Sequence, residues 1–385
     1  MSTIGLQATE LTAAERELQA EVRAWLDERL PEGGYPIGLG MVGHVDPEFS
    51  RDLGAKGWLG MALPQEYGGG GRTAVERLVV VEELLARGAP VGHHWIADRQ
   101  SGPSIALHGT PAQKQEFLPR IASGELCFAI GMSEPDSGSD LASIRSKAEP
   151  TERDGVSGWV INGSKIWTSG AHIADYILGL FRTGNDKHAG LTQFIIDRET
   201  EGLRIDPIPF IDGELHFCLL TFEDVFVPDS RRLGEVGWGW MQNQGELVLE
   251  RGGVDRWMSA MPVLERWVQR ELATDAAADA RLKDDLAGIT SRCWAFHGMS
   301  LAVARMVDAG ELPKTEAALV KDMATRFEQE CIEIVVRHLG RMPDPTSEDP
   351  FEALLATAVL SKPSWTIRGG TTEILHNLIA KELRR

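Results

Sequence analysis

Hydrophobic residues recur at intervals of three and four along the first third of the chain, the spacing that places them on one face of an α-helix. Residues 11–30 (LTAAERELQAEVRAWLDERL), 73–88 (TAVERLVVVEELLARG) and 111–124 (PAQKQEFLPRIASG) follow this pattern. Thr12 stands where it can cap the first of these helices, and Gly88 stands at the end of the second. This first region therefore predicts an all-helical domain.

The pattern changes in the middle of the chain, where glycines, serines and turn pairs separate short β-rich runs. These runs are ELCFAIGMS, GWVINGSKIWTS, ADYILGLF, LTQFIIDR and HFCLLTFEDVFV. They predict a small, mostly antiparallel β domain. Helical spacing returns in long stretches toward the C-terminus, which is typical of an antiparallel bundle. We therefore expect an α+β multidomain fold: an N-terminal helical domain at 1–125, a central β domain at 126–235 and a C-terminal four-helix bundle at 236–385.

The composition narrows the classes of partner. Among 385 residues there are 57 Asp and Glu but only 39 Lys and Arg, which gives a formal net charge of -18. A chain this acidic repels phosphate, so we expect no nucleic-acid partner. No segment resembles a membrane span or a signal peptide, and we expect a cytoplasmic protein. The four cysteines (Cys127, Cys218, Cys293, Cys331) are far apart in the sequence. Since no ligand spacing is present, we expect no metal site.

Two motifs in the β region carry the chemistry. The first is GMSEPDSGSD at residues 131–140, and the second is INGSKIWTSG at 161–170. They are preceded by GWLGMALPQEYGGGG and followed by FEDVFVPDSRRLGEVGWGW. In this order and setting the chain resembles the acyl-CoA dehydrogenase family over nearly its whole length. The resemblance implies an FAD flavoprotein that removes hydrogen across the α and β carbons of an acyl thioester.

The flavin ring is flat and amphipathic, so it needs an apolar plate on one face and donors along its edge. By resemblance, Trp167 packs against the ring and Ser169 donates toward its N5 atom. Ile130, Met132 and Ser133 line the edge, and Gly138 and Ser139 let the backbone approach the pyrophosphate and the pantetheine chain. Taken singly, Trp167 could equally be a core tryptophan, and the segment SGSD could be an exposed turn. Their joint occurrence in this order favours the flavin site.

The α proton of a thioester is weakly acidic, so its removal needs a base held against that carbon and a polarised carbonyl. Many members of the family carry this base as a glutamate near the C-terminus. Here the matching segment is TIRGGTTEI, and Gly369 stands in the place of that glutamate. The isovaleryl-CoA and long-chain branch instead carries the base on the first helix of the bundle. The matching position, ten residues after Trp240, is Glu250 in LVLERGG. The alternative is a surface carboxylate paired with a neighbouring arginine.

The same resemblance implies the substrate contacts. A glycine at 369 leaves room beside the reacting carbons, which favours a bulky or branched acyl group. A backbone N–H near Gly369 and a ribityl hydroxyl of the flavin would polarise the thioester. Ser139, Arg251 and Gly370 complete the predicted substrate-binding set. Arg251 could also be a helix-surface charge, and Gly370 could be a simple helix-entry turn.

The chain departs from the family where most members carry an arginine–phenylalanine–glycine motif that reaches the partner's FAD. The matching stretch reads ERWVQRELATDAAADARLKDD, and the motif is absent. Thr371 and Glu373 still match positions that approach a neighbour's flavin. We therefore expect either a heteromer with a second dehydrogenase-like subunit or a homo-oligomer, with an electron-transfer flavoprotein as electron acceptor. The alternative functions are a flavin monooxygenase or oxidase of this fold and a non-catalytic partner subunit.

Overall fold

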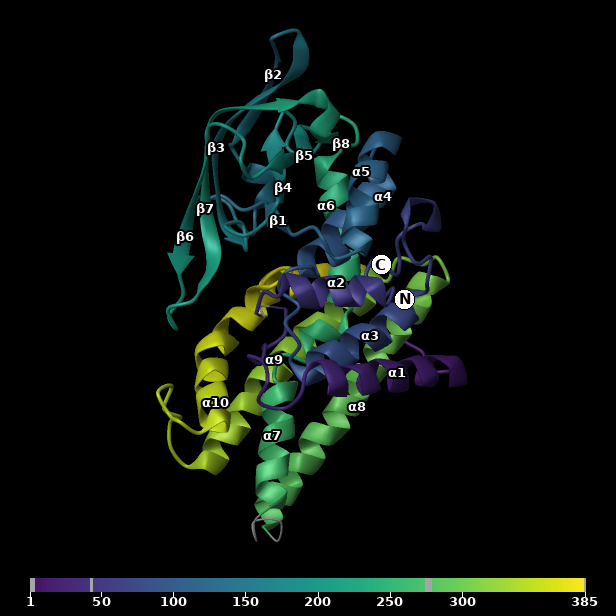
Figure 1. The fold of residues 1–385 in the computed structure, drawn as a ribbon, viewed down its shortest axis with the longest axis vertical. Helices are drawn as coiled ribbons and strands as arrows, with labels where there is room; N and C mark the ends of the chain where they lie inside the picture. The colour runs from purple at the N-terminus through teal and green to yellow at the C-terminus, as the bar shows by residue number, and fades with distance from the viewer. Residues whose placement is uncertain (1–3, 42–43, 274–278, 384–385) are drawn as a thin grey trace. The chain divides into compact units, whose positions relative to one another are not determined.

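The computed structural model describes residues 4–41, 44–273 and 279–383, and the side chains of residues 246–250 and 383 are outside its description. Its packing divides the chain into two compact units. The sheet unit comprises residues 45–72 and 92–247, and the helical unit comprises residues 1–44, 73–91 and 248–385. The predicted order of helical, β and helical regions along the chain is confirmed (Figure 1).

The sheet unit is built on eight strands, counted over the described residues. They are β1 (Phe128–Gly131), β2 (Lys147–Arg153), β3 (Val156–Ser169), β4 (Tyr176–Arg182), β5 (Leu191–Asp197), β6 (Leu203–Pro209), β7 (Leu215–Pro228) and β8 (Arg232–Leu233). Their order is β6-β7-β3-β2-β4-β5-β8, and β1 joins the sheet by pairing with β4. Most neighbours are antiparallel, whereas the β1–β4 pair is parallel. The GMSEPDSGSD motif begins at Gly131, the last residue of β1, so this parallel pair places the start of the motif beside β4.

Aromatic contacts fix the helices of the sheet unit against its strands. Phe117 of α5 (Pro111–Ala122) packs edge-on against Phe128 of β1 and Tyr176 of β4, with ring centroids 5.9 and 5.1 Å apart. Edge-to-face pairs of this kind add to the free energy gained by burying the rings. The unit also contains α2 (Pro47–Ala55), α4 (Gly102–His108) and most of α6 (Gly239–Arg251).

The helical unit combines two N-terminal helices with the C-terminal bundle. Its helices are α1 (Ala13–Arg29), α3 (Ala74–Arg87), α7 (Met261–Leu272), α8 (Ala280–Asp308), α9 (Lys314–Leu339), α10 (Pro350–Ser361) and α11 (Thr372–Leu383). The Thr12 hydroxyl accepts from the Glu15 N–H, and the Glu15 carboxylate accepts from the Thr12 N–H. This reciprocal cap confirms the predicted start of α1. Gly88, at φ 68°, ends α3 as predicted.

Ion pairs tie the N-terminal helices of this unit to the long helix α8. Glu15 of α1 binds Arg305 with an N–O distance of 2.6 Å, and Glu82 of α3 binds His297 at 2.7 Å. Both carboxylates are nearly buried, so these pairs are less exposed to solvent screening than ordinary surface pairs. They hold α1 and α3 against the C-terminal bundle.

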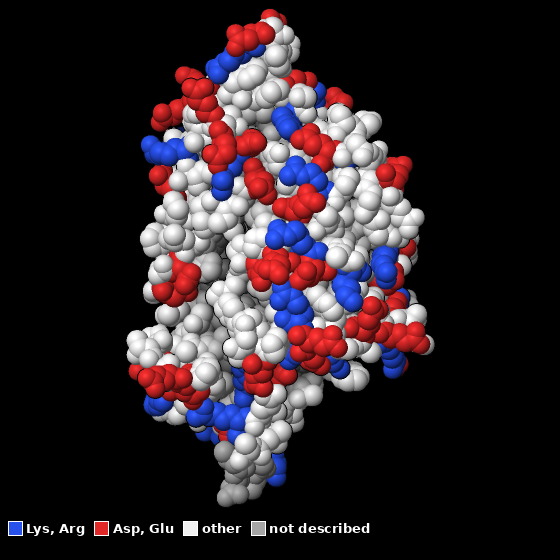
Figure 2. All heavy atoms as spheres, in the orientation of Figure 1, with Lys and Arg blue, Asp and Glu red and all other residues white. Residues whose placement is uncertain are grey.

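Charged side chains of both signs intermix over the face shown in Figure 2. No helix in the described parts of the chain is both long enough and apolar enough to cross a membrane.

Candidate active site

The loop that follows β1 is fastened to strand β3 through its backbone carbonyls. Lys165 donates from Nζ to the Met132 carbonyl at 3.1 Å, and the Ile166 N–H donates to the Ser133 carbonyl at 2.9 Å. Ile130 lies within β1 and is half-buried, as are Met132 and Ser133. The structure therefore brings the first predicted flavin motif against the strand that carries the second.

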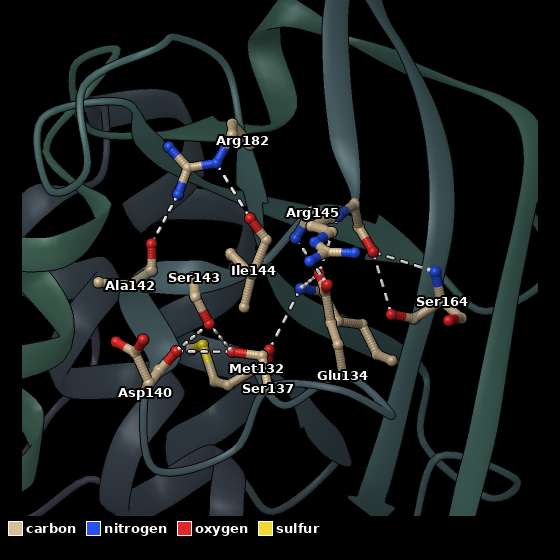
Figure 3. Close-up of polar contacts among 12 residues, drawn as sticks. Met132, Glu134, Ser137, Asp140, Ala142, Ser143, Ile144, Arg145, Ser164 and Arg182 are labelled. Carbon is tan, nitrogen blue, oxygen red and sulfur yellow. Dashed lines mark hydrogen bonds and ion pairs between the residues drawn. The ribbon is translucent and has the colours of Figure 1, made fainter.

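A buried ion pair lies at the base of this loop, and its carboxylate partner, Glu134, is labelled in Figure 3. Lys165 is fully buried, and its Nζ lies 2.8 Å from Oε1 of Glu134. Glu134 also accepts hydrogen bonds from the N–H groups of Arg145 and Ser146 at 2.6 and 2.9 Å. Burial lowers the pKa of Lys165 to about 8, against the opposing effect of Glu134. Burial would raise the pKa of Glu134, but Lys165 and the two N–H donors outweigh it and lower that pKa.

The tip of the loop is shaped by serine hydroxyls. Ser137 donates from Oγ to the Asp140 carbonyl at 2.6 Å, and the Ser143 hydroxyl donates to the same carbonyl at 2.7 Å (Figure 3). These hydrogen bonds leave Gly138 and Ser139 exposed between Ser137 and Asp140. A Cβ added at Gly138 would meet nothing within 4 Å, so the backbone there is open to close approach by a ligand.

Trp167 is held in a conformation that few side chains adopt. Its φ is 60°, in the left-handed region, and it lies at a bulge where β3 shifts register against β7. The indole is 56% exposed, and its supporting contact is an edge-on Phe217 ring with a centroid distance of 5.9 Å. Ser169 lies two residues on, half-buried at the end of β3 and paired with Phe217. An exposed and strained tryptophan is typical of a binding surface rather than a core.

In the helical unit, a glycine turn precedes α11. Gly369 and Gly370 have φ values of 68° and 104°, which side chains rarely adopt. Arg251, at the end of α6, is buried and donates from Nε to the Gly369 carbonyl at 2.9 Å. A Cβ added at Gly370 would lie 3.3 Å from the Arg251 guanidinium. The structure therefore brings together three of the four predicted substrate residues.

Glu250, the predicted base, immediately precedes Arg251 on α6, but its side chain is outside the described residues. Thr371 immediately precedes α11 and accepts through its carbonyl from the Leu375 N–H at 3.1 Å, and Glu373 lies in the first turn of the helix. Hydrogen bonds from its own backbone N–H and from Thr371 lower the pKa of Glu373, which is exposed.

Beneath the glycine turn lies a buried charged pair that sequence reasoning did not single out. Arg368 binds Glu328 through one guanidinium nitrogen and donates from another to the Ser259 hydroxyl at 3.1 Å. Burial raises the pKa of the Glu328 carboxyl and lowers that of the Arg368 guanidinium. The paired charges fix the residue immediately before Gly369.

The sequence matches three acyl-CoA dehydrogenase family models: the N-terminal domain over residues 12–125, the middle domain over 129–225 and the C-terminal domain over 237–384. It is 31% identical to acyl-CoA dehydrogenase FadE26 of Mycobacterium tuberculosis, with 96% of each chain covered. The chain belongs to the acyl-CoA dehydrogenase family. This acyl-CoA dehydrogenase is an oxidoreductase that acts on acyl-CoA, and FAD is its cofactor.

Two solved structures resemble this acyl-CoA dehydrogenase in fold. One is described as the Tcur3481-Tcur3483 steroid ACAD, with a TM-score of 0.86, 30% identity and 97% of each chain covered. The other is a glutaryl-CoA dehydrogenase from Mycobacterium smegmatis in complex with FADH2, with a TM-score of 0.81 and 25% identity. That match covers 97% of this chain and 95% of the other.

The residues of the acyl-CoA dehydrogenase fit an isoalloxazine ring. The exposed face of Trp167 offers an aromatic plate for the ring. The half-buried Ser133 and Ser169 offer hydroxyls close to β3, the strand that contains Trp167. The open backbone at Gly138 suits the phosphate-bearing end of a nucleotide. The sequence did not indicate that Lys165 and Glu134 support this surface through a buried ion pair. From the sequence alone, Lys165 is expected to be an ordinary strand residue whose side chain points into solvent.

Proposed function

We propose that this chain catalyses FAD-dependent α,β-dehydrogenation of a bulky or branched acyl-CoA to the trans-2-enoyl-CoA, with Glu250 as the base. The observation that carries the proposal is the hydrogen bond from Arg251 Nε to the Gly369 carbonyl, at 2.9 Å. It joins the end of α6, where Glu250 lies, to the turn in which Gly369 replaces the family's other glutamate. This contact supports our proposal that the two alternative positions of the base belong to one site in this chain.

The chain's own residues supply the proton transfer and the polarisation. Glu250 takes the α proton, and a backbone N–H near Gly369 donates to the thioester carbonyl as negative charge develops there. When bound, FAD supplies the oxidant that accepts the hydride from the β carbon. Loss of one proton and one hydride leaves the carbon–carbon double bond. Trp167 and Ser169 orient the cofactor, and Ser139 and Arg251 contact the substrate.

Gly369 supports the assignment of a bulky acyl group. Where other members of the family place a glutamate side chain, this turn places only a hydrogen atom. The space released lies beside the position of the reacting carbons. The description of one structural relative as a steroid ACAD agrees with a large acyl substrate.

The base assignment is tested with Glu250→Gln, which keeps the shape of the side chain and removes its basicity. We expect the flavin absorption band to persist and turnover to fall by about 10³-fold, because general-base catalysis contributes about 10²–10⁴. The exposed Glu265→Gln on α7 is the matched control and should leave turnover unchanged. Undiminished dehydrogenation in Glu250→Gln would exclude the base assignment and favour the monooxygenase or oxidase alternative.

We further propose that the chain works as an oligomer, with an electron-transfer flavoprotein as its electron acceptor. The missing interface motif within ERWVQRELATDAAADARLKDD supports a heteromer whose second subunit completes the FAD site. The test is the visible absorption spectrum of the chain purified alone. We expect a colourless protein that gains a stoichiometric flavin band when co-expressed with a second dehydrogenase-like chain. A full flavin band in the chain alone would instead assign a homo-oligomer.

A further inference from the structure

The glycine turn before α11 is held by two cations that bind its carbonyl groups. Lys321 of α9 donates from Nζ to the Thr366 carbonyl at 3.0 Å and to the Gly370 carbonyl at 2.6 Å. Arg251 holds the Gly369 carbonyl, which lies between them in the sequence. Three carbonyls within five residues are thus drawn toward positive charge.

Lys321 is fully buried, which is rare for a lysine. Removing an ammonium group from water is costly, so its hydrogen bonds must compensate for much of the lost hydration. An apolar side chain of similar length could fill the same space without that cost. The presence of a lysine here therefore indicates a role for its N–H donors, and these reach the glycine turn.

Two consecutive glycines give this turn many accessible conformations, and Lys321 and Arg251 select one. Because a trans peptide is planar, its N–H points opposite to its C=O. The peptide that gives its carbonyl to Arg251 therefore directs the Gly370 N–H away from the guanidinium. Among the described residues, no backbone carbonyl accepts a hydrogen bond from this N–H. A cation on the carbonyl also polarises the peptide and strengthens its N–H as a donor.

We propose that Lys321 is a positioning residue: with Arg251, it fixes the Gly369–Gly370 turn so that its N–H donates to the thioester carbonyl of the substrate. This inference rests on the proposed dehydrogenation and assigns the residue that maintains its carbonyl-polarising group. Lys321 acts through the turn and does not itself contact the substrate.

The test compares Lys321→Met, which removes the donors, with Lys321→Gln, which keeps two N–H donors on a neutral side chain. Lys362→Met is the control, because Lys362 binds Glu333 through Nζ and its loss removes a lysine charge from the same unit. All variants are studied in the flavin-loaded assembly. The first readout is amide hydrogen exchange of residues 366–371 without substrate. The second is the infrared carbonyl stretch of bound 2,2-dimethylpropanoyl-CoA labelled with ¹³C at the carbonyl. This probe has no α hydrogen and cannot be dehydrogenated.

For Lys321→Met we expect exchange in 366–371 to accelerate about tenfold and the carbonyl stretch to return toward its value in water. We expect kcat to fall about 100-fold and KM to change less than about threefold, because misplacing a catalytic group by about 1 Å can cost 10²-fold. Lys321→Gln should lie between Lys321→Met and the wild type, and the control should match the wild type.

Unchanged exchange and kcat in Lys321→Met would overturn the proposal. So would failure of both Lys321 variants to fold, because the lysine would then maintain the bundle rather than the turn. Neither the exchange rate nor the carbonyl stretch depends on proton removal. Glu250→Gln could retain full turnover while Lys321→Met shows faster amide exchange in 366–371 and a carbonyl stretch shifted toward its value in water. In that case the base assignment would fail and the positioning role of Lys321 would stand.

Discussion

The two units of this acyl-CoA dehydrogenase each contain a fully buried lysine, and the two lysines are used differently. In the sheet unit, Lys165 binds the Glu134 carboxylate and the Met132 carbonyl. In the helical unit, Lys321 binds the carbonyls of Thr366 and Gly370. Both ammonium groups restrain a loop that carries predicted site residues.

The difference lies in how much of each loop is defined by its side chains. The loop at Glu134 is held by a carboxylate, two serine hydroxyls and several backbone donors, so many contacts determine its shape. Gly369 and Gly370 have no side chains to define their turn. Instead, Arg251 and Lys321 bind its backbone carbonyls directly. We infer that substitutions of polar side chains will damage the first loop most, whereas an added Cβ will damage the second most.

The largest expected effect is in the sheet unit. Glu134→Gln leaves a buried ammonium without its counter-charge and should lower the free energy of unfolding by about 3–5 kcal/mol. The double variant with Lys165→Met removes both charges and should be destabilised less than either single variant. Urea unfolding of the full chain measures all three. Lys187→Met, which disrupts the exposed Lys187–Asp140 pair, is the control and should change stability by less than about 1 kcal/mol. Additive single effects would show that the buried charges do not interact.

A smaller effect is expected at the glycine turn. Gly369→Ala places a Cβ on a residue with φ 68° and should cost about 1–2 kcal/mol of stability. It should also reduce kcat/KM for branched acyl-CoAs more than for straight-chain ones, because the methyl group enters the proposed acyl space. Steady-state kinetics with a matched pair of straight and branched thioesters measures this ratio. An equal loss for both substrates would remove the steric argument for a bulky acyl group.

The pH dependence of stability is expected to have opposite signs in the two units. The His297 ring donates from Nδ1 to the Glu82 carboxylate, which raises the pKa of His297. The stability contributed by this hydrogen bond is full below pH 6.5 and is lost as pH rises through the raised pKa. Burial lowers the pKa of Lys165 to about 8, so the unfolded chain binds more protons between pH 8 and 10.5. Stability from this group therefore rises with pH across that window. Measuring the free energy of unfolding against pH for the wild type, His297→Asn and Lys165→Met separates the contributions of His297 and Lys165. Curves that run parallel for all three proteins would contradict both contributions.

Sequence periodicity located the amphipathic helices and their ends well. Thr12 and Gly88 were predicted as helix boundaries because capping depends on local backbone chemistry, and the structure confirms both. The short helix α2 was missed although Asp46 caps it and Pro47 stands in its first turn, both of which are local start signals. The strand β6, with two prolines in seven residues, was also missed. It is stabilised by pairing with β7, a signal that local propensity does not contain.

The candidate site was predictable where a motif is contiguous, as in the segments around Ser133 and Trp167. The buried supports were not predictable, because Lys165 and Lys321 are distant in sequence from much of what they bind. Lys321 is 49 residues from Gly370, and Lys165 is 31 residues from Glu134. Nothing local in LVKDM or GSKIW distinguishes a buried lysine from a solvated one, since burial is decided by tertiary packing.

The left-handed backbone at Trp167 has a consequence for protein engineering. A non-glycine residue in this region raises the energy of the folded state by about 1–2 kcal/mol. Replacement by glycine would relieve that strain and remove an exposed indole, so a directed-evolution screen that scores only heat resistance should enrich such replacements. In cells that also express the second subunit, the enriched clones would be heat-resistant but colourless, and screening there for yellow colonies alongside heat resistance would guard against them.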